Sequence, residues 1–186
     1  MARRAVFDPS DRDVFNEQRQ RFDWSLLQNG FVYRYDTRFQ LDSACERLTD
    51  LGYLVHRIEA HDWASIGDMH AAFAAEMSFP AYYGRNLDAF DDVLGDVATF
   101  DYGSDSDSTG TVLAIASYDQ LVQLDRRTAK VVLDIFAKQA RLAPCTAIRC
   151  CAWSNRLRPT SDRSAASTCP RAARGTVNRI RRGPST

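Results

Sequence analysis

The segment Thr111–Ala116, Thr-Val-Leu-Ala-Ile-Ala, constrains the fold more than any other part of the chain. It is a continuous apolar run, and the preceding residues 101–110 are rich in Asp, Ser and Gly, which is typical of a loop. A half-exposed strand alternates polar and apolar residues, whereas a parallel strand covered on both faces is apolar throughout. We therefore expect a central strand of a parallel sheet that has helices on both faces.

A strand–helix–strand unit is predicted earlier in the chain. Residues 31–35 and 53–58 are predicted as short strands. Residues 39–51 repeat apolar side chains at helical spacing, and Gly52 supplies a C-terminal stop. This order implies a parallel strand pair joined by a right-handed crossover.

Two further helices complete the predicted domain. Ser65 and Asp68 resemble a capping box that opens one helix, and residues 128–140 form another, rich in Val, Leu, Ile and Phe. We expect one α/β domain over residues 31–145, with a small parallel sheet of three to four strands flanked by helices. Residues 1–30 are interpreted as a polar N-terminal arm, frayed or partly helical, that docks through its aromatic side chains.

Residues 79–97 combine three kinds of residue chemistry in the run FPAYYGRNLDAFDDVLGDV. Phe79 precedes a proline and is therefore pushed out of the helical region, which ends the preceding element. Two tyrosines and a glycine then form a short aromatic turn, and Asn86 is a favourable N-cap for a new helix.

The helix predicted from Leu87 to about Val97 has two contrasting faces. One arc carries five apolar side chains: Leu87, Phe90, Val93, Leu94 and Val97. The opposite arc carries three carboxylates one turn apart: Asp88, Asp92 and Asp96. Asp91 lies near the edge of the apolar side. A row of carboxylates on a helix is most often a solvated surface, so the acidic arc alone does not identify a binding site.

The run from Tyr82 to Phe90, followed by Asp92, resembles the inhibitory loop and helix of the barstar family, intracellular protein inhibitors of the ribonuclease barnase. The match is ungapped, and the broader resemblance covers about half of the chain, roughly residues 53–144. It implies a barstar-like fold and an acidic helix that blocks a ribonuclease active site, into which Asp92 reaches. The partner-binding residues that it implies are Tyr82, Tyr83, Gly84, Asn86, Asp88 and Asp92.

Three positions depart from the family pattern. Arg85 replaces an acidic residue, Asp91 replaces a tryptophan, and Lys138 stands where the family offers another contact glutamate. The strand and helix predicted over residues 31–51 are absent from barstar itself. These differences leave the inhibitor class intact but do not fix the identity of the nuclease.

Charge is divided unevenly along the chain. Residues 31–145 carry 10 basic and 18 acidic side chains, whereas residues 146–186 carry 9 basic and 1 acidic. The acidic domain repels nucleic acid and attracts a basic protein. We therefore expect a basic ribonuclease as partner, no direct binding of nucleic acid by the domain, and a monomer before complex formation. The alternative is a barstar-like domain that recognises a different basic protein.

An enzyme is not expected. His56 falls within a predicted strand, where a packed or hydrogen-bonded role is favoured, and neither a phosphate-binding loop nor a nucleophile motif occurs. Asp105, Asp107 and Thr109 mimic half of a calcium loop, but Ala116 stands where a glutamate is required. The sequence therefore predicts no catalytic residue, no metal site and no cofactor.

The location of the chain is interpreted from what its sequence lacks. No stretch is long and apolar enough to span a membrane, and the N-terminal residues lack the apolar run of a signal peptide. The five cysteines are odd in number and show no zinc spacing. We expect a cytoplasmic protein without membrane contact.

The closing strand expected after residues 128–140 has no apolar counterpart in the sequence. Residues 146–186 are basic and rich in Ser, Ala, Pro and Thr, which predicts a disordered, low-complexity tail. A nucleic-acid-binding arm is an alternative, although Trp153 is its single aromatic residue. A third interpretation is a change of reading frame near Pro144. Plausible codons for residues 143–155, read one base earlier, can yield AVHCDPVLRLVQS, which contains a strand-like VLRLV.

Overall fold

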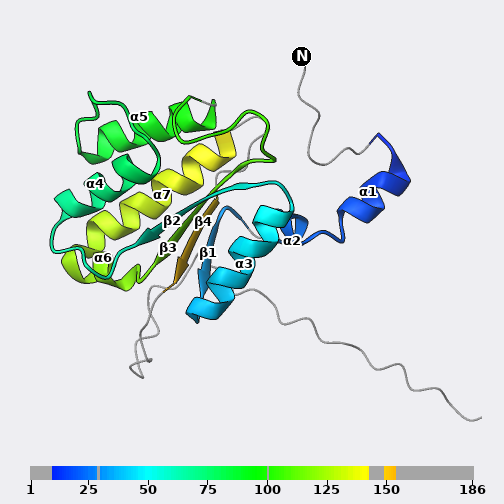
Figure 1. The fold of residues 1–186 in the computed structure, drawn as a ribbon, viewed down its shortest axis with the longest axis horizontal. Helices are drawn as coiled ribbons and strands as arrows, with labels where there is room; N and C mark the ends of the chain where they lie inside the picture. Colours follow the sequence, from blue (N-terminus) through cyan, green and yellow to red (C-terminus); the bar gives the residue numbers. More distant parts are fainter. Residues whose placement is uncertain (1–9, 29, 100, 143–148, 154–186) are drawn as a thin grey trace, which may run out of the picture.

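The structure is a computed structural model that describes residues 10–28, 30–99, 101–142 and 149–153. Its centre is a parallel sheet in the order β1-β4-β3-β2, with helices on both faces (Figure 1). The strands are β1 (Val32–Tyr35), β2 (Leu54–Glu59), β3 (Thr111–Ala116) and β4 (Arg149–Trp153). The predicted α/β class with a small parallel sheet is confirmed.

Seven helices occur within the described residues. They are α1 (Arg12–Gln18), α2 (Phe22–Gln28), α3 (Arg38–Asp50), α4 (Ile66–Glu76), α5 (Leu87–Ala98), α6 (Asp119–Leu124) and α7 (Arg126–Leu142). The capping box that the sequence predicts at the start of α4 is present. The Ser65 hydroxyl accepts from the Asp68 amide at 3.2 Å, and the Asp68 carboxylate accepts from the Ser65 amide at 2.9 Å.

Strand β3 joins two hydrophobic cores, as its apolar run predicts. All six of its residues are buried. Leu113 and Ile115 belong to the core that α4, α5, α6 and α7 cover, whereas Val112 and Ala114 belong to the core beneath α2 and α3. Successive strand residues point to opposite faces, so one short apolar segment supplies both layers.

The path of the chain explains why α3 is separated from the later helices. The chain runs from β1 at one edge of the sheet to β2 at the other, and then returns through β3 to β4. Right-handed crossovers in opposite directions place their helices on opposite faces. Accordingly α3 covers one face and α4 to α7 the other (Figure 1). The sequence prediction that the first two strands pair directly is wrong, because β4 and β3 lie between them.

The closing strand, which the sequence analysis considered missing, is present as β4. It pairs with β1 through Val32 and Cys150 and with β3 through Val112 and Arg149, among other pairs. It was missed because its sequence, Arg-Cys-Cys-Ala-Trp, has no apolar periodicity. Ladder hydrogen bonds come from the backbone, however, and an inner position between two strands satisfies them for almost any side chain. Residues 154–186 of the predicted tail lie outside the described residues.

The N-terminal residues 10–28 form two helices, and α2 packs against the α3 side of the sheet. Asp23 in α2 is fully buried. The Arg21 guanidinium donates to both of its carboxylate oxygens, at 3.1 and 2.8 Å, and the Tyr53 hydroxyl donates to one of them at 2.9 Å. A buried carboxylate needs such partners, so this cluster fixes how α2 docks.

Candidate protein-binding site

Helix α5 presents the two faces that its sequence predicts. Its apolar residues Phe90, Val93, Leu94 and Val97 are buried, whereas Asp88 and Asp92 are exposed. The Phe90 ring lies 4.9 Å from the Phe73 ring of α4 and 5.6 Å from the Phe136 ring of α7, between centroids. Because three helices share this aromatic cluster, the acidic face rests on a rigid base.

The start of α5 is fixed by a side-chain cap. The Asn86 side chain accepts from the Ala89 amide at 2.8 Å, and its amide group donates to the Gly84 carbonyl at 3.3 Å. A Cβ atom at Gly84 would lie 3.1 Å from the Asn86 side-chain nitrogen, so a larger residue there would disturb the cap. Arg85 between them adopts a positive φ of 50°, a strained conformation that often marks functional loops.

The two tyrosines of the turn have different environments. Tyr83 is buried, its hydroxyl lies 2.5 Å from Nδ1 of His70 in α4, and its ring packs edge-on against Phe79. Burial raises the pKa of the Tyr83 hydroxyl and lowers the pKa of His70. Both groups are therefore neutral at pH 7, and one hydrogen bond joins the hydroxyl to the imidazole nitrogen.

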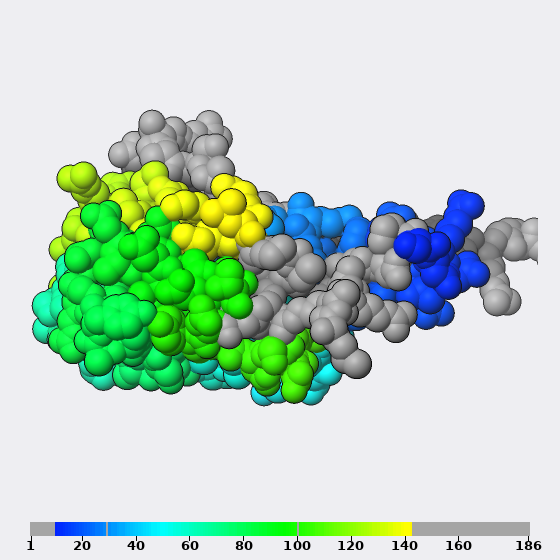
Figure 2. Space-filling model, turned by 90° about the horizontal axis from the view of Figure 1, so that it is seen from above, coloured from blue at the N-terminus to red at the C-terminus, as the bar shows by residue number. Residues whose placement is uncertain are grey.

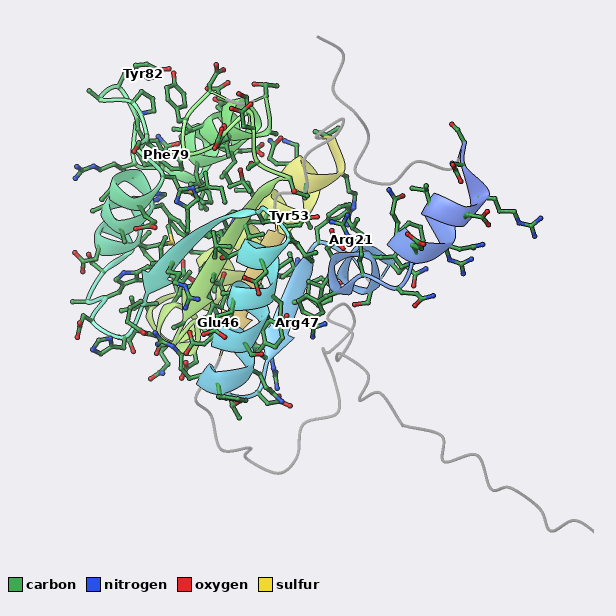
Figure 3. The ribbon with its side chains drawn as sticks, turned by 45° about the vertical axis from the view of Figure 1, so that its right-hand side comes forward. Arg21, Glu46, Arg47, Tyr53, Phe79 and Tyr82 are labelled. Atoms are coloured by element: carbon green, nitrogen blue, oxygen red, sulfur yellow. The ribbon has the colours of Figure 1, made fainter. Side chains whose placement is uncertain are left out.

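Tyr82, in contrast, is 74% exposed and lies at the outer edge of the molecule in Figure 3. Its hydroxyl shares a hydrogen bond of 2.5 Å with the hydroxyl of Tyr102, and this bond raises the pKa of Tyr102 to about 12. Tyr83 thus anchors the turn, while the Tyr82 side chain remains exposed at the surface.

Asp88 and Asp92 make no hydrogen bond and no ion pair with the residues that the structure describes. They stand at positions i and i+4 of α5, which are neighbours on a helix surface. Like charges at this spacing cost a helix about 0.2–0.5 kcal/mol. Asp88 lies in the first turn of α5, where the helix dipole favours a carboxylate, but the described residues use neither carboxylate in a hydrogen bond or an ion pair.

Asp91, by comparison, is engaged within the domain. Its carboxylate accepts from the Lys138 ammonium and, at 2.7 Å, from the Gln139 side-chain amide, both on α7. Gln139 also donates to the Asp91 carbonyl at 3.0 Å. Two positions that depart from the family pattern, Asp91 and Lys138, are thus ion-pair partners of each other.

The remaining polar groups that the sequence singled out have structural contacts. His56 is buried and its Nε2 lies 2.7 Å from the Gly103 carbonyl, which confirms its predicted hydrogen-bonded role. Asp105 accepts from the Asp107 amide at 2.8 Å within the loop. Within the described part of the chain, no three His, Cys, Asp or Glu side chains gather closely enough to hold a metal ion. The helices described there are too short or too polar to cross a membrane.

Three supporting residues were not identified from the sequence: His70, Tyr102 and Gln139. A signal existed for His70, because it lies on the apolar arc of α4, one turn after Ile66 and one turn before Phe73. Tyr102 and Gln139 lie far along the chain from the groups that they contact, so no local pattern indicated them.

Comparison with known proteins identifies one family. The family model described as Barstar (barnase inhibitor) matches residues 53–148, which is more than half of the chain. No curated protein matches the chain significantly. Among solved structures, the chain is similar to the Aeropyrum pernix ORC2 protein in its ADPNP-ADP complexes, with 9% sequence identity and a TM-score of 0.49. That similarity covers 82% of this chain and 43% of the other, so the chain spans less than half of that protein.

Proposed function

The chain belongs to the barstar family, and from this premise we propose that it binds a barnase-like ribonuclease and blocks the active site with the acidic face of α5. The observation that carries the proposal is the pair of exposed carboxylates, Asp88 and Asp92, which have no partner among the described residues. They lie on a helix whose opposite face is held in the core, so their position is fixed before a partner arrives.

The chemistry of the partner supports this assignment. A ribonuclease binds RNA phosphates in a cationic groove. Two carboxylates one helical turn apart match such a groove and accept charge-assisted hydrogen bonds from its arginine and lysine side chains. Tyr82 supplies an exposed aromatic contact next to them, and aromatic residues beside charged ones are typical binding hot spots.

The electrostatics of the whole domain favour rapid association. Residues 31–145 carry 10 basic and 18 acidic side chains, an excess of eight negative charges. A field of this sign steers a basic protein toward the acidic face and loses strength with added salt. We further propose that the protein acts in the cytoplasm and protects the producing cell from the ribonuclease.

A second candidate function is recognition of a different basic protein by the same surface. Arg85 favours it, because this exposed cation lies in the turn next to the acidic face. The two candidates share the carboxylates and differ in the shape and charge of the partner around them.

The experiment is a titration of barnase activity with the purified full chain. Stoichiometric inhibition is expected, weakened at least tenfold in the double variant Asp88→Ala Asp92→Ala, which is about 1.4 kcal/mol or more. The variant Asp101→Ala, an exposed acid beyond the end of α5, is the matched control and should inhibit like the parent. If the double variant inhibits barnase as well as the parent does, the proposed mechanism is wrong. If the chain inhibits no ribonuclease, the second candidate function is favoured.

A further inference from the structure

Lys138 of α7 pairs with a carboxylate of the acidic helix, and its position is built into the packing of α5 on α7. Lys138 donates to Asp91, and the two side chains are 53% and 24% exposed. In Figure 2 the green surface of α5 lies next to the yellow end of α7, on one face of the molecule. Lys138 is therefore part of the surface that a protein covering α5 would meet.

The contacts around Asp91 fix this cation in place. Gln139, the residue after Lys138, donates to the carbonyl and to the carboxylate of Asp91, at 3.0 and 2.7 Å. One turn further along α5, the helices approach at Gly95, where a Cβ atom would lie 3.6 Å from the Gln139 side-chain oxygen. These contacts set the register between the two helices and hold Lys138 beside Asp91.

The result is a surface of mixed charge. Asp91 lies three residues after Asp88 and directly before Asp92, so the three side chains share one region of α5. Lys138 neutralises Asp91, whereas Asp88 and Asp92 have no ion-pair partner among the described residues. An ammonium group has three N–H donors, and those that Asp91 does not accept can bind a carboxylate of another protein.

We propose that Lys138 determines which ribonuclease the domain accepts. The partner needs a carboxylate opposite Lys138, next to the cations that bind Asp88 and Asp92. This inference rests on the proposed function. An active-site rim that is cationic throughout repels Lys138, whereas a rim with one acidic residue forms a charge-assisted hydrogen bond with it. Specificity is a difference between affinities, and this cation creates one by repulsion as well as by attraction.

The test uses barnase as a cationic probe in the inhibition assay and compares the parent chain with two variants. Lys138→Met removes the charge but keeps most of the aliphatic stem. Lys138→Glu combined with Asp91→Asn reverses the charge without placing two carboxylates against each other. We expect affinity for barnase to rise in that order, by about tenfold or more for the reversed pair, and to rise less at high salt.

The control is Lys130→Glu on the same helix, which lowers the net charge by two units, one more than the reversed pair does. Lys130 lies eight residues before Lys138. Its side chain is 78% exposed and pairs with Asp134. It should alter the affinity by less than about twofold, because an exposed charge away from the contact is screened. Melting curves of all the variants establish that each one is folded.

The outcomes separate this inference from the function on which it rests. If Asp92→Ala weakens inhibition but the Lys138 variants bind barnase no better than the parent, the inference is wrong and the proposed function stands. An equal gain in the Lys130→Glu variant would also overturn it, since net charge would then explain the effect. If neither the parent nor any variant binds barnase, the proposed function and this inference both fail.

Discussion

Carboxylates on the two helical layers of the sheet have opposite environments. On the α3 side, Asp42 accepts from Arg57 at 2.8 Å and from Arg38 at 3.2 Å, and Glu59 accepts from Arg38. On the α5 side, Asp88 and Asp92 have no such partner among the described residues. The two regions carry the same kind of side chain, yet Asp42 and Glu59 are paired within the domain, whereas Asp88 and Asp92 are not paired among the described residues.

The difference separates the acidic residues that the fold pairs from those that we propose bind a partner. Glu59 is partly buried, which acts to raise its pKa, but hydrogen bonds from Ser117 and Arg38 hold the pKa below its ordinary value. The folded state therefore favours this carboxylate as an anion. Asp88 and Asp92 have no such hydrogen-bond donors among the described residues, and their i, i+4 spacing costs the helix a little stability. Figure 3 places Tyr82 and Phe79, next to α5, on the opposite side of the molecule from Arg21 and Tyr53.

The largest expected effect comes from removing the sheet strand on which both regions depend. Ending the chain after Ile148 deletes β4, the inner strand between β1 and β3. The backbone groups of β1 and β3 that pair with β4 are then left unpaired, which removes most of the roughly 5–15 kcal/mol that stabilises a small domain. We expect no cooperative melting transition by circular dichroism.

A chain that ends after Asn155 is the control for this truncation, because it retains β4. It should melt at a temperature close to that of the full chain. A chain ending after Ile148 that melts as cooperatively as the full protein would show that β4 contributes nothing to the fold.

The next largest effect concerns the most deeply paired carboxylate. Arg21→Met removes the cation that binds Asp23, which is 0% exposed, and leaves a buried negative charge. Breaking such a pair costs about 3 kcal/mol in the free energy of unfolding at pH 7, measured by urea denaturation. Arg34→Met is the matched control, because the Arg34–Asp36 pair is exposed and should contribute less than about 0.5 kcal/mol. Equal losses in both variants would show that the burial of Asp23 does not matter.

A smaller effect is expected from pH at the turn before α5. Burial lowers the pKa of His70 below the ordinary value of 6.5, so the unfolded chain binds a proton at a higher pH than the folded protein does. Stability contributed by neutral His70 is therefore complete above about pH 6.5 and declines as the pH falls below that value. His70→Gln should flatten this part of the curve of unfolding free energy against pH. An unchanged slope in the variant would exclude His70 as its cause.

Most of the fold could be predicted from local patterns. The apolar run of β3 and the helical spacing in α3, α4, α5 and α7 each appear within a short window, because burial dictates the residue types. Strand β4 could not be predicted, since its place depends on backbone groups of β1 and β3 that are distant in sequence. The same applies to the strand order, which local periodicity does not encode.

The site divides in the same way. The acidic and apolar faces of α5 and the Asn86 cap follow from sequence spacing, and all are present in the structure. The exposure of Tyr82 and the burial of Tyr83 could not be distinguished, because adjacent tyrosines in a turn have no fixed period. The pairing of Asp91 with Lys138 joins two helices that are far apart in the chain, so only the structure reveals it.

The most direct measurement compares Asp92→Ala with Asp42→Ala in two assays, barnase inhibition and thermal melting. We expect each variant to affect a different one of the two assays. Asp92→Ala should weaken inhibition at least tenfold, about 1.4 kcal/mol, with an unchanged melting temperature, because its carboxylate serves only a partner. Asp42→Ala should inhibit like the parent but lose up to about 1 kcal/mol of stability, because Arg57 loses this acceptor and Arg38 keeps only Glu59. If a folded Asp92→Ala variant inhibits barnase as well as the parent does, the acidic face of α5 is not the inhibitory surface.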